Sequence, residues 1–333
     1  MSMNMTRRAL LAVTAAASVA FSAGVALAED KIKLRLSAVN NEADARAVTM
    51  TEIFAPAVAG FAEFEPHWSG TLFKQGTELE AIARGNLEMS ITSAQELSEF
   101  IPAFSIFTAG YVMQSPEHQV AVFNDALMDP LKKQVEDELG VKLLAVMYLG
   151  KRQVNLRGDK KIMTPADLDG VKLRMPGSEA WQFLGKALGA SPVPIAYTEL
   201  YTALQTGAVD GQDNPLPNDV NMKFYEVTDQ IVLTSHLVDL NYIAFSKKVW
   251  DSLTPEQQDT VQKAALATAE AETKMQLANE EKDRAFLEEK GLVFNTPDVA
   301  AFRKHVQEAY LSSDLSKNWP EGMLEKINAL GEQ

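Results

Sequence analysis

The sequence contains no cysteine among its 333 residues. Disulfide bonds, cysteine-liganded zinc and thiol catalysis are therefore excluded together. Histidine is scarce as well, and the four residues are scattered without metal-ligand spacing: His67, His118, His236 and His305. The fold must be held by burial of apolar side chains, which a hydrophobic content of 46% permits.

Short motifs of common enzyme classes are also missing. The chain has no G-x-S-x-G nucleophile elbow, no G-x-x-x-x-G-K or G-x-G-x-x-G phosphate loop and no H-E-x-x-H zinc motif. The stretch "DGQDN" (210–214) lacks the acidic ladder and the distal glutamate of a calcium loop. We therefore expect no cofactor, no metal and no catalysis. An enzyme that works with two carboxylates stays open, because nothing singles out or excludes a pair.

Basic residues are outnumbered, since 31 Lys and Arg face 45 Asp and Glu and give a formal charge of −14. An acidic surface argues against nucleic acid and anionic lipid as partners. Residues 1–28 combine Arg7 and Arg8, an apolar run and a small-residue site ending at Ala28, which predicts a cleavable secretory signal peptide. The twin-arginine route and a retained membrane anchor are the alternatives.

Cleavage after Ala28 would remove two arginines and no acidic residue, so the 305 residues left from 333 would carry a charge of −16. A chain of that length favours two lobes over one. Strand patterns alternate with helical patterns, which predicts an α/β fold with largely parallel sheets. The expected strands are 31–39, 141–148 (buried on both faces) and short ones in "RQVNLR" and "VKLRM"; helices are expected at 43–60, 178–188 and 198–206.

Two long segments would connect the lobes. Residues 229–246 read as an extended crossover with a possible break near His236. Residues 254–291 read as one helix, because Thr254, Pro255 and Gln257 form a capping box and Gly291 ends the pattern. Such a helix would be roughly 54 Å long and lie across both lobes, unless it is kinked near its middle.

Two arginines stand where strands end. In "GVKLRMPGSEAW", Arg174 closes a short strand before Pro176 and Gly177, and Ser178 is a good cap for the following helix. Arg152 follows the apolar strand 141–148. A guanidinium offers a planar fork for a carboxylate, and a helix N-terminus adds free N–H groups. The alternative is that each arginine pairs with one of the chain's own acids.

The block "TPADLDGVKLRMPGSEAWQFLGKALGASPVPIAYTELYTALQTGAVDGQDNPLPN" (164–218) resembles the signature region of the substrate-binding proteins of TRAP (tripartite ATP-independent periplasmic) transporters. The segment "RGNLEMSITSA" and the long late helix fit this family too. The resemblance implies a periplasmic, monomeric protein of two hinged α/β lobes with crossover strands and a helix spanning both. Lobe I would be 29–149 plus about 240–280, and lobe II 150–239 plus about 281–333. Its partners would be the membrane permease subunits.

The resemblance also implies which residues bind an organic acid between the lobes. Arg174 would form the ion pair with the ligand carboxylate, Arg152 would support it, Asn214 would donate to it and Tyr197 would lie against the ligand. Where the family commonly has Glu in "GQEN", this chain has Asp213, outside the expected contacts. The further expected ligand-facing residues are Asn40, Asn41, Gln75, Glu78, Ser93, His236 and Asp239.

The quoted segments look most like members that bind sugar acids, so the expected ligand is a hexuronate such as galacturonate or glucuronate. Its hydroxyls need polar partners away from the carboxylate, and Trp181 or Trp68 could stack on the sugar unless each is ordinary core. A C4-dicarboxylate or a small hydroxy or keto acid is the alternative within the family. An exported enzyme acting on sugar acids is the alternative of another class.

Overall fold

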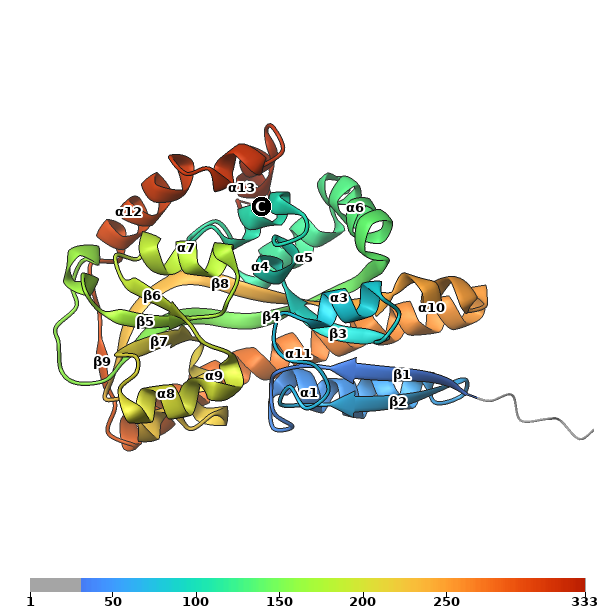
Figure 1. Cartoon of the computed structure of the whole chain (residues 1–333), viewed down its shortest axis with the longest axis horizontal. Helices are drawn as coiled ribbons and strands as arrows, with labels where there is room; N and C mark the ends of the chain where they lie inside the picture. The colour runs from blue at the N-terminus through green and yellow to red at the C-terminus, as the bar shows by residue number, and fades with distance from the viewer. Residues whose placement is uncertain (1–30, 333) are drawn as a thin grey trace, which may run out of the picture. The chain divides into compact units, whose positions relative to one another are not determined.

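The computed structural model describes residues 31–332, in which nine strands form one mixed sheet (Figure 1). The predicted signal peptide lies outside the described residues. The sheet order is β2-β1-β3-β8-β4-β7-β5-β6, and β9 pairs with β8 off this path. The strands are β1 (Ile32–Ser37), β2 (Ala62–His67), β3 (Met89–Ser93), β4 (Val141–Leu156), β5 (Lys172–Met175), β6 (Ser191–Pro194), β7 (Gly211–Asn214), β8 (Gln230–Ser246) and β9 (Val293–Asn295).

The expectation of largely parallel sheets is wrong at the centre. β1 is parallel to β2 and β3, and β5 is parallel to β6 and β7, but β8 is antiparallel to β3 and to β4, and β4 is antiparallel to β7. The apolar run 141–148 is buried on both faces because helices cover β4 on both sides, not because its neighbours are parallel. Burial alone does not reveal strand direction.

β4 and β8 cross the whole molecule and join its two ends (Figure 1). The strands predicted at 141–148 and in "RQVNLR" are one strand, β4, whose pairing with β8 shifts register at three points. The break expected near His236 is a bulge within a continuous β8. Ser235 there has φ of 43°, and Gln153 of β4 accepts from its N–H (2.8 Å) and donates to its hydroxyl (3.1 Å).

The helices cover both faces of this sheet. They are α1 (Ala45–Thr49), α2 (Ala55–Val58), α3 (Glu78–Ala83), α4 (Ala94–Leu97), α5 (Pro116–Asn124), α6 (Asp129–Leu139), α7 (Glu179–Ala187), α8 (Leu200–Thr206), α9 (Leu216–Asn221), α10 (Lys247–Ser252), α11 (Pro255–Glu289), α12 (Val299–Leu311) and α13 (Met323–Gly331). The helix expected at 43–60 contains a π-helical turn, η1 (Met50–Phe54), between α1 and α2. Pro56 explains this turn, because it has no N–H to donate to the carbonyl four residues earlier.

The long helix α11 runs unbroken for 35 residues, as predicted. Thr254 accepts from the N–H of Gln257 and Gln257 reaches back, which forms the expected capping box. At about 1.5 Å per residue the helix is about 52 Å long. It contacts β4 along its course, α1 and α2 toward one end of the molecule and α9 toward the other.

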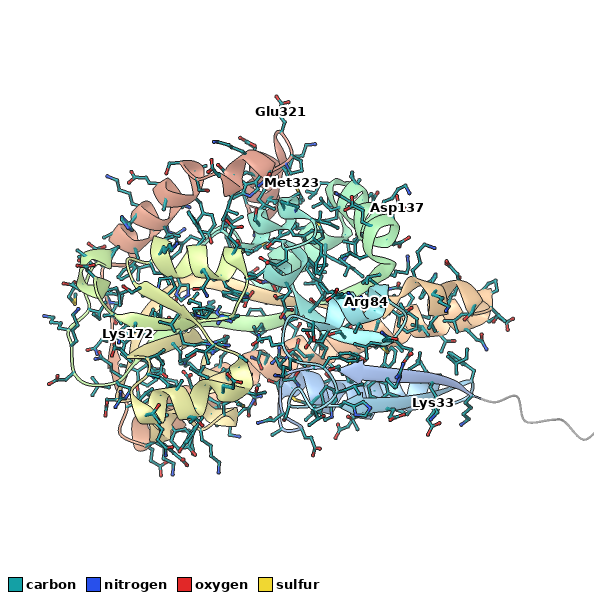
Figure 2. All side chains as sticks on the ribbon, in the orientation of Figure 1. Lys33, Arg84, Asp137, Lys172, Glu321 and Met323 are labelled. Carbon is teal, nitrogen blue, oxygen red and sulfur yellow. The ribbon has the colours of Figure 1, made fainter. Side chains whose placement is uncertain are left out.

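Apolar side chains gather in separate clusters along this frame. One includes Leu34 and Phe54 under β1 to β3, and a large one includes Leu173 and Trp181 around β5 and α7. A smaller cluster around Leu204 lies beneath α8. None of the helices within residues 31–332 combines the length and apolar character needed to cross a membrane. Charged side chains such as Lys33, Asp137 and Glu321 project from the periphery (Figure 2).

Candidate functional site in a polar cavity at the strand ends

A cavity of about 60 Å³ lies near the middle of the sheet, between the strands β1 to β3 on one side and β5 to β7 on the other. We call β1 to β3 with their connections the β1 end, and β5 to β7 with theirs the β5 end. The β1 end contributes Val39, Asn40, Arg46, Gln75, Ile91, Ser93 and Glu96; the β5 end contributes Arg174, Pro176, Trp181, Tyr197, Asn214 and Asn218; β4 and β8 contribute Leu149, Arg152, Asp239 and Asn241. Ligand sites of α/β folds commonly form beyond the carboxyl ends of strands.

Arg174 sits at the end of β5 and is 1% exposed. Its Nε donates to the carbonyl of Ile195 (2.7 Å) and its Nη2 to Oε1 of Gln75 (3.4 Å). Among residues 31–332 no Asp or Glu oxygen lies within ion-pair distance of this guanidinium. Burial lowers the pKa of Arg174 to about 10, although the charge of Asp213 opposes this shift. Within the described residues Arg174 therefore has no acid of the chain as its partner, and its contact with a ligand carboxylate remains a prediction.

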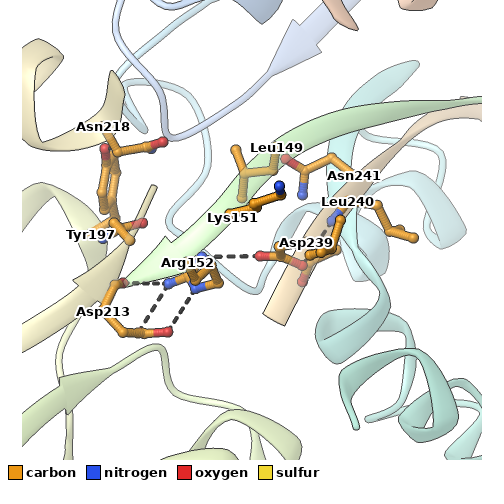
Figure 3. A network of polar contacts seen from close by, with 12 residues as sticks. Leu149, Lys151, Arg152, Tyr197, Asp213, Asn218, Asp239, Leu240 and Asn241 are labelled. Carbon is orange, nitrogen blue, oxygen red and sulfur yellow. Dashed lines mark hydrogen bonds and ion pairs between the residues drawn. The ribbon is translucent and has the colours of Figure 1, made fainter. Parts of the chain in front are cut away.

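Arg152 is in the opposite situation, because two buried acids hold it (Figure 3). Its Nε and Nη2 bind the two oxygens of Asp213 (2.7 and 3.0 Å), and its Nη1 binds Asp239 (3.0 Å). The guanidinium also lies 4.3 Å from the ring centre of Trp181. Four of its five N–H groups are used if the bond to the Asp213 carbonyl is counted.

Asp213, which we expected to lie outside the ligand contacts, is the structural partner of Arg152. Its side chain is completely buried and also accepts from Nε2 of His236 (3.1 Å). Burial would raise the pKa of Asp213, but Arg152 and His236 hold it well below its usual range. Burial raises the pKa of Asp239, and Arg152 only partly offsets this. Arg152 is thus neutralised from within, and its direct contact with a ligand remains a prediction.

The remaining β5-end residues surround Arg174. The ring centre of Tyr197 is 5.8 Å from its guanidinium carbon, and the Tyr197 hydroxyl accepts from Asn218 (2.9 Å). Asn214 ends β7 and donates one N–H to the side chain of Gln212, which leaves its second N–H available. Ser178 caps α7 as predicted, since its hydroxyl accepts from the N–H of Trp181.

The β1-end expectations divide into residues that line the cavity and residues that do not. Asn40, Gln75 and Ser93 line it, as does Asp239 of β8. Three other expected residues are not part of the lining: Glu78, Asn41 and His236. Glu78 is buried at the start of α3, Asn41 donates to the carbonyl of Asn221 (2.9 Å), and His236 contacts Asp213.

Several lining residues were not predicted. Arg46 is held by Asp44 through two contacts of 2.8 Å and donates to Oδ1 of Asn241 (2.6 Å). Glu96 completes the capping box of α4, where its Oε2 accepts from the N–H of Ser93 (3.0 Å). Of these unpredicted residues, Asn241 is the one that the sequence could have indicated, because it is an amide within the apolar run "DLNYIAF".

Charge pairing in the cavity is therefore uneven. Arg46 pairs with Asp44, Arg152 pairs with Asp213 and Asp239, and Arg174 pairs with no acid in the described part of the chain. The same residues contain no cluster of His, Asp and Glu side chains that could hold a metal ion. The arrangement is suited to receiving one anionic group at Arg174 and polar groups elsewhere.

The chain is similar to known solute-binding proteins. Residues 40–315 match the family model "Bacterial extracellular solute-binding protein, family 7" (DctP). Solute-binding protein RD1_1052 of Roseobacter denitrificans is 31% identical over 92% of this chain and 93% of its own length. The sialic acid-binding periplasmic protein SiaP of Vibrio cholerae is 28% identical over 73% of this chain and 75% of its own.

Solved structures are similar over the whole described fold. A TRAP periplasmic solute-binding protein from Roseobacter denitrificans with bound 3-deoxy-D-manno-oct-2-ulosonic acid (KDO) is 65% identical, covers 91% of this chain and 100% of that one, and has a TM-score of 0.90. RD1_1052 with bound L-galactonate has a TM-score of 0.81 at 29% identity over 90% and 98% of the two chains. The predicted two-lobe α/β fold and the predicted family are confirmed, and the chain belongs to bacterial extracellular solute-binding protein family 7, the periplasmic solute-binding proteins of TRAP transporters.

Proposed function

We propose that this protein captures a sugar acid through an ion pair between the ligand carboxylate and Arg174, and delivers the acid to the permease subunits of a TRAP transporter. The observation that carries the proposal is the buried guanidinium of Arg174, which has no acidic partner among residues 31–332. Burying a charge without a partner is costly, and a bound carboxylate would remove that cost.

The energy of such a site is sufficient for useful affinity. Hydrogen bonds to charged groups contribute about 1.5–3 kcal/mol each. Arg174 has N–H groups left at Nη1 and Nη2, and Asn214 has one at Nδ2. Three such bonds would supply most of the roughly 8 kcal/mol that corresponds to a micromolar dissociation constant.

A monocarboxylate fits the cavity better than a C4-dicarboxylate. A second carboxylate would need a second cation without an acidic partner, but Arg46 and Arg152 are already paired. The remaining polar groups of the wall, including Asn40, Asn241 and Glu96, can serve the hydroxyls of a sugar acid.

KDO is our first candidate ligand, because a protein that is 65% identical to this chain was crystallised with it. The apolar wall formed by Ile91, Leu149 and Pro176 can accept a deoxy carbon without leaving a polar atom unpaired. The hexuronates galacturonate and glucuronate, which the sequence favoured, are the second candidates.

Ligand entry requires the cavity to open. Its volume of about 60 Å³ is well below the roughly 300–1,000 Å³ that is typical of ligand pockets. We propose that the two lobes, 29–149 plus about 240–280 and 150–239 plus about 281–333, separate by bending of β4 and β8. The register shift between Tyr148 and Gly150 in β4 supports a hinge there.

Calorimetry and thermal shift with a panel of acids test the proposal. The panel contains KDO, galacturonate, glucuronate, galactonate and succinate, with Arg174→Lys as the variant. We expect at least one sugar acid to bind one per chain, to be recovered chemically unchanged, and to bind Arg174→Lys at least about tenfold more weakly, or about 1.4 kcal/mol. Turnover of the ligand, or equal binding by the variant, would overturn it.

Export is tested separately. We propose that the signal peptide is removed after Ala28, so that the periplasmic protein begins at Glu29. N-terminal sequencing of protein from the periplasmic fraction checks this. A protein that retains Met1 and fractionates with membranes would contradict the cleavage.

A further inference from the structure

Gln75 supplies the only side-chain acceptor for the Arg174 guanidinium within residues 31–332. Its Oε1 accepts two hydrogen bonds, one from Nη2 of Arg174 (3.4 Å) and one from the backbone N–H of Tyr197 (2.8 Å). Gln75 belongs to the β1 end, whereas Arg174 and Tyr197 belong to the β5 end. One amide oxygen therefore connects the two walls of the cavity at the residue proposed to bind the ligand.

The loop that carries Gln75 is shaped to reach across. Gly70 and Gly76 have φ of 65° and 85°, which favours glycine, and the hydroxyls of Thr71 and Thr77 each donate to a carbonyl three residues earlier (2.8 Å). The loop is tied to β1 where the N–H of Phe73 donates to the hydroxyl of Ser37 (3.2 Å). The loop that carries Gln75 is therefore held in place by contacts other than those with Arg174.

The partner on the other wall also needs this contact. Tyr197 begins a helical turn (Tyr197–Glu199) that leads into α8, and the first N–H groups of a helical segment have no partner within it. The side chain of Gln75 satisfies that N–H, while the Tyr197 ring packs near the guanidinium of Arg174. Loss of Gln75 would leave a buried donor unpaired.

We propose that Gln75 is a positioning residue that closes the cavity over the bound acid and orients Arg174 toward the carboxylate; this inference rests on the proposed function. The amide oxygen holds the guanidinium without neutralising its charge, whereas the carboxylate of a glutamate at this position would neutralise it. The 3.4 Å contact is long for a hydrogen bond and is readily exchanged for a ligand oxygen. The 2.8 Å bond to Tyr197 keeps the two walls together while that exchange occurs.

The chain offers a matched control. Asn41 also joins the two walls, because its Nδ2 donates to the carbonyl of Asn221 (2.9 Å), but it has no contact with Arg174. Asn41→Ala therefore removes a cross-wall hydrogen bond of similar length without touching the proposed carboxylate site.

Stopped-flow measurement of ligand release, followed by the fluorescence of cavity-lining Trp181, tests the proposal with the panel acid that binds the wild type most tightly. For Gln75→Ala we expect a dissociation rate about tenfold higher and an association rate changed less than about twofold, as most affinity changes within one interface occur in dissociation. For Asn41→Ala we expect a dissociation rate raised by no more than about threefold. Gln75→Glu should weaken binding of every acid at least about tenfold, because the introduced carboxylate occupies Arg174.

A ligand-free measurement separates this inference from the proposed function. Hydrogen exchange of the Tyr197 amide should be slow in the wild type and at least about tenfold faster in Gln75→Ala, with a single cooperative melting transition in both proteins as the check on folding. Equal exchange in both proteins, or equal dissociation rates for Gln75→Ala and Asn41→Ala, would overturn the inference. If the wild type binds no acid, the proposed function fails, and with it the role of Gln75 in binding, while the exchange data still decide whether the bridge exists.

Discussion

Replacing Arg174 by lysine keeps the positive charge but removes the planar fork and the Nε–H that binds the Ile195 carbonyl. The ligand carboxylate would lose one of its two charge-assisted hydrogen bonds, worth about 1.5–3 kcal/mol. That loss corresponds to a dissociation constant about 10- to 150-fold higher. Truncation to methionine removes both bonds and the charge, so binding should fall below detection in the same calorimetric titration.

Stability without ligand gives the second half of this prediction. Arg174 is a buried cation that lacks an acidic partner in residues 31–332, and burial already lowers its pKa to about 10. Arg174→Met should therefore leave the free energy of unfolding of the unliganded protein unchanged or raise it. Arg152→Met is the matched control. It leaves the buried acids Asp213 and Asp239 without their cation and should lower the free energy of unfolding by about 3–5 kcal/mol.

The reasoning requires that Arg152→Met lowers the free energy of unfolding and that Arg174→Met does not. Urea denaturation gives the free energy of unfolding, and calorimetry with the panel acids gives affinity. A loss of stability in Arg174→Met as large as that in Arg152→Met would show that Arg174 has a structural role in the unliganded fold. Retained affinity in Arg174→Met would show that the carboxylate binds elsewhere.

Three further predictions follow from buried polar contacts. Asp213→Asn leaves Arg152 with one acid and should lower the free energy of unfolding by about 3 kcal/mol in urea denaturation; no loss would contradict the pairing. Burial, then the charge of Glu96, raises the pKa of Glu78 to about 8. Between about pH 4.3 and 8 the folded state therefore holds a proton that the unfolded state has released. The stability that this group contributes is fully present below about pH 4.3 and is lost as the pH rises to 8. Glu78→Gln should therefore raise the free energy of unfolding at pH 8 by at least about 1 kcal/mol and leave it unchanged at pH 4, a difference that equal shifts at both pH values would refute. Tyr148→Phe removes the hydroxyl contacts to Glu280 of α11 (3.0 and 3.1 Å) and should cost about 1 kcal/mol in the same denaturation experiment, whereas no change would mean that the bond is fully replaced by water.

Local signals in the sequence predicted individual elements well. The capping box at Thr254 fixed the start of α11, and its length followed from an uninterrupted helical composition. Ser178 and the turn at Pro176 placed the start of α7 and the end of β5 correctly. Each of these features depends on residues within a few positions of one another, which is why a single sequence is enough.

Strand direction could not be predicted in the same way. β4 pairs with β8 although residues 157–229 lie between them in the sequence, and its two predicted pieces are one strand because β7 and β8 extend the ladder beyond Tyr148. Helices on both faces bury an antiparallel strand as completely as a parallel one. The pattern of buried residues therefore carries no information on direction here.

The candidate site, like the fold, could be predicted only in part from the sequence. The resemblance pointed to Arg174, Asn214 and Gln75, which do line one cavity, but it gave no means to place Glu78 or His236 behind the lining. Arg46 was missed because its partner Asn241 is 195 positions away in the sequence. Pairings of that kind are set by the tertiary fold and leave no local trace.

The selection of one arginine as the anion receptor is therefore a property of the fold and not of composition. All three cavity guanidiniums carry the same charge, and the chain has enough acids for each. Asp44 lies two residues from Arg46, and the strand pairing of β7 and β8 with β4 brings Asp213 and Asp239 to Arg152. Within residues 31–332, Arg174 at the end of β5 donates only to the Ile195 carbonyl and to the side-chain amide of Gln75. A ligand with one carboxylate neutralises this cation, whereas a second carboxylate would meet arginines whose acids must first be displaced at the cost of two buried charges.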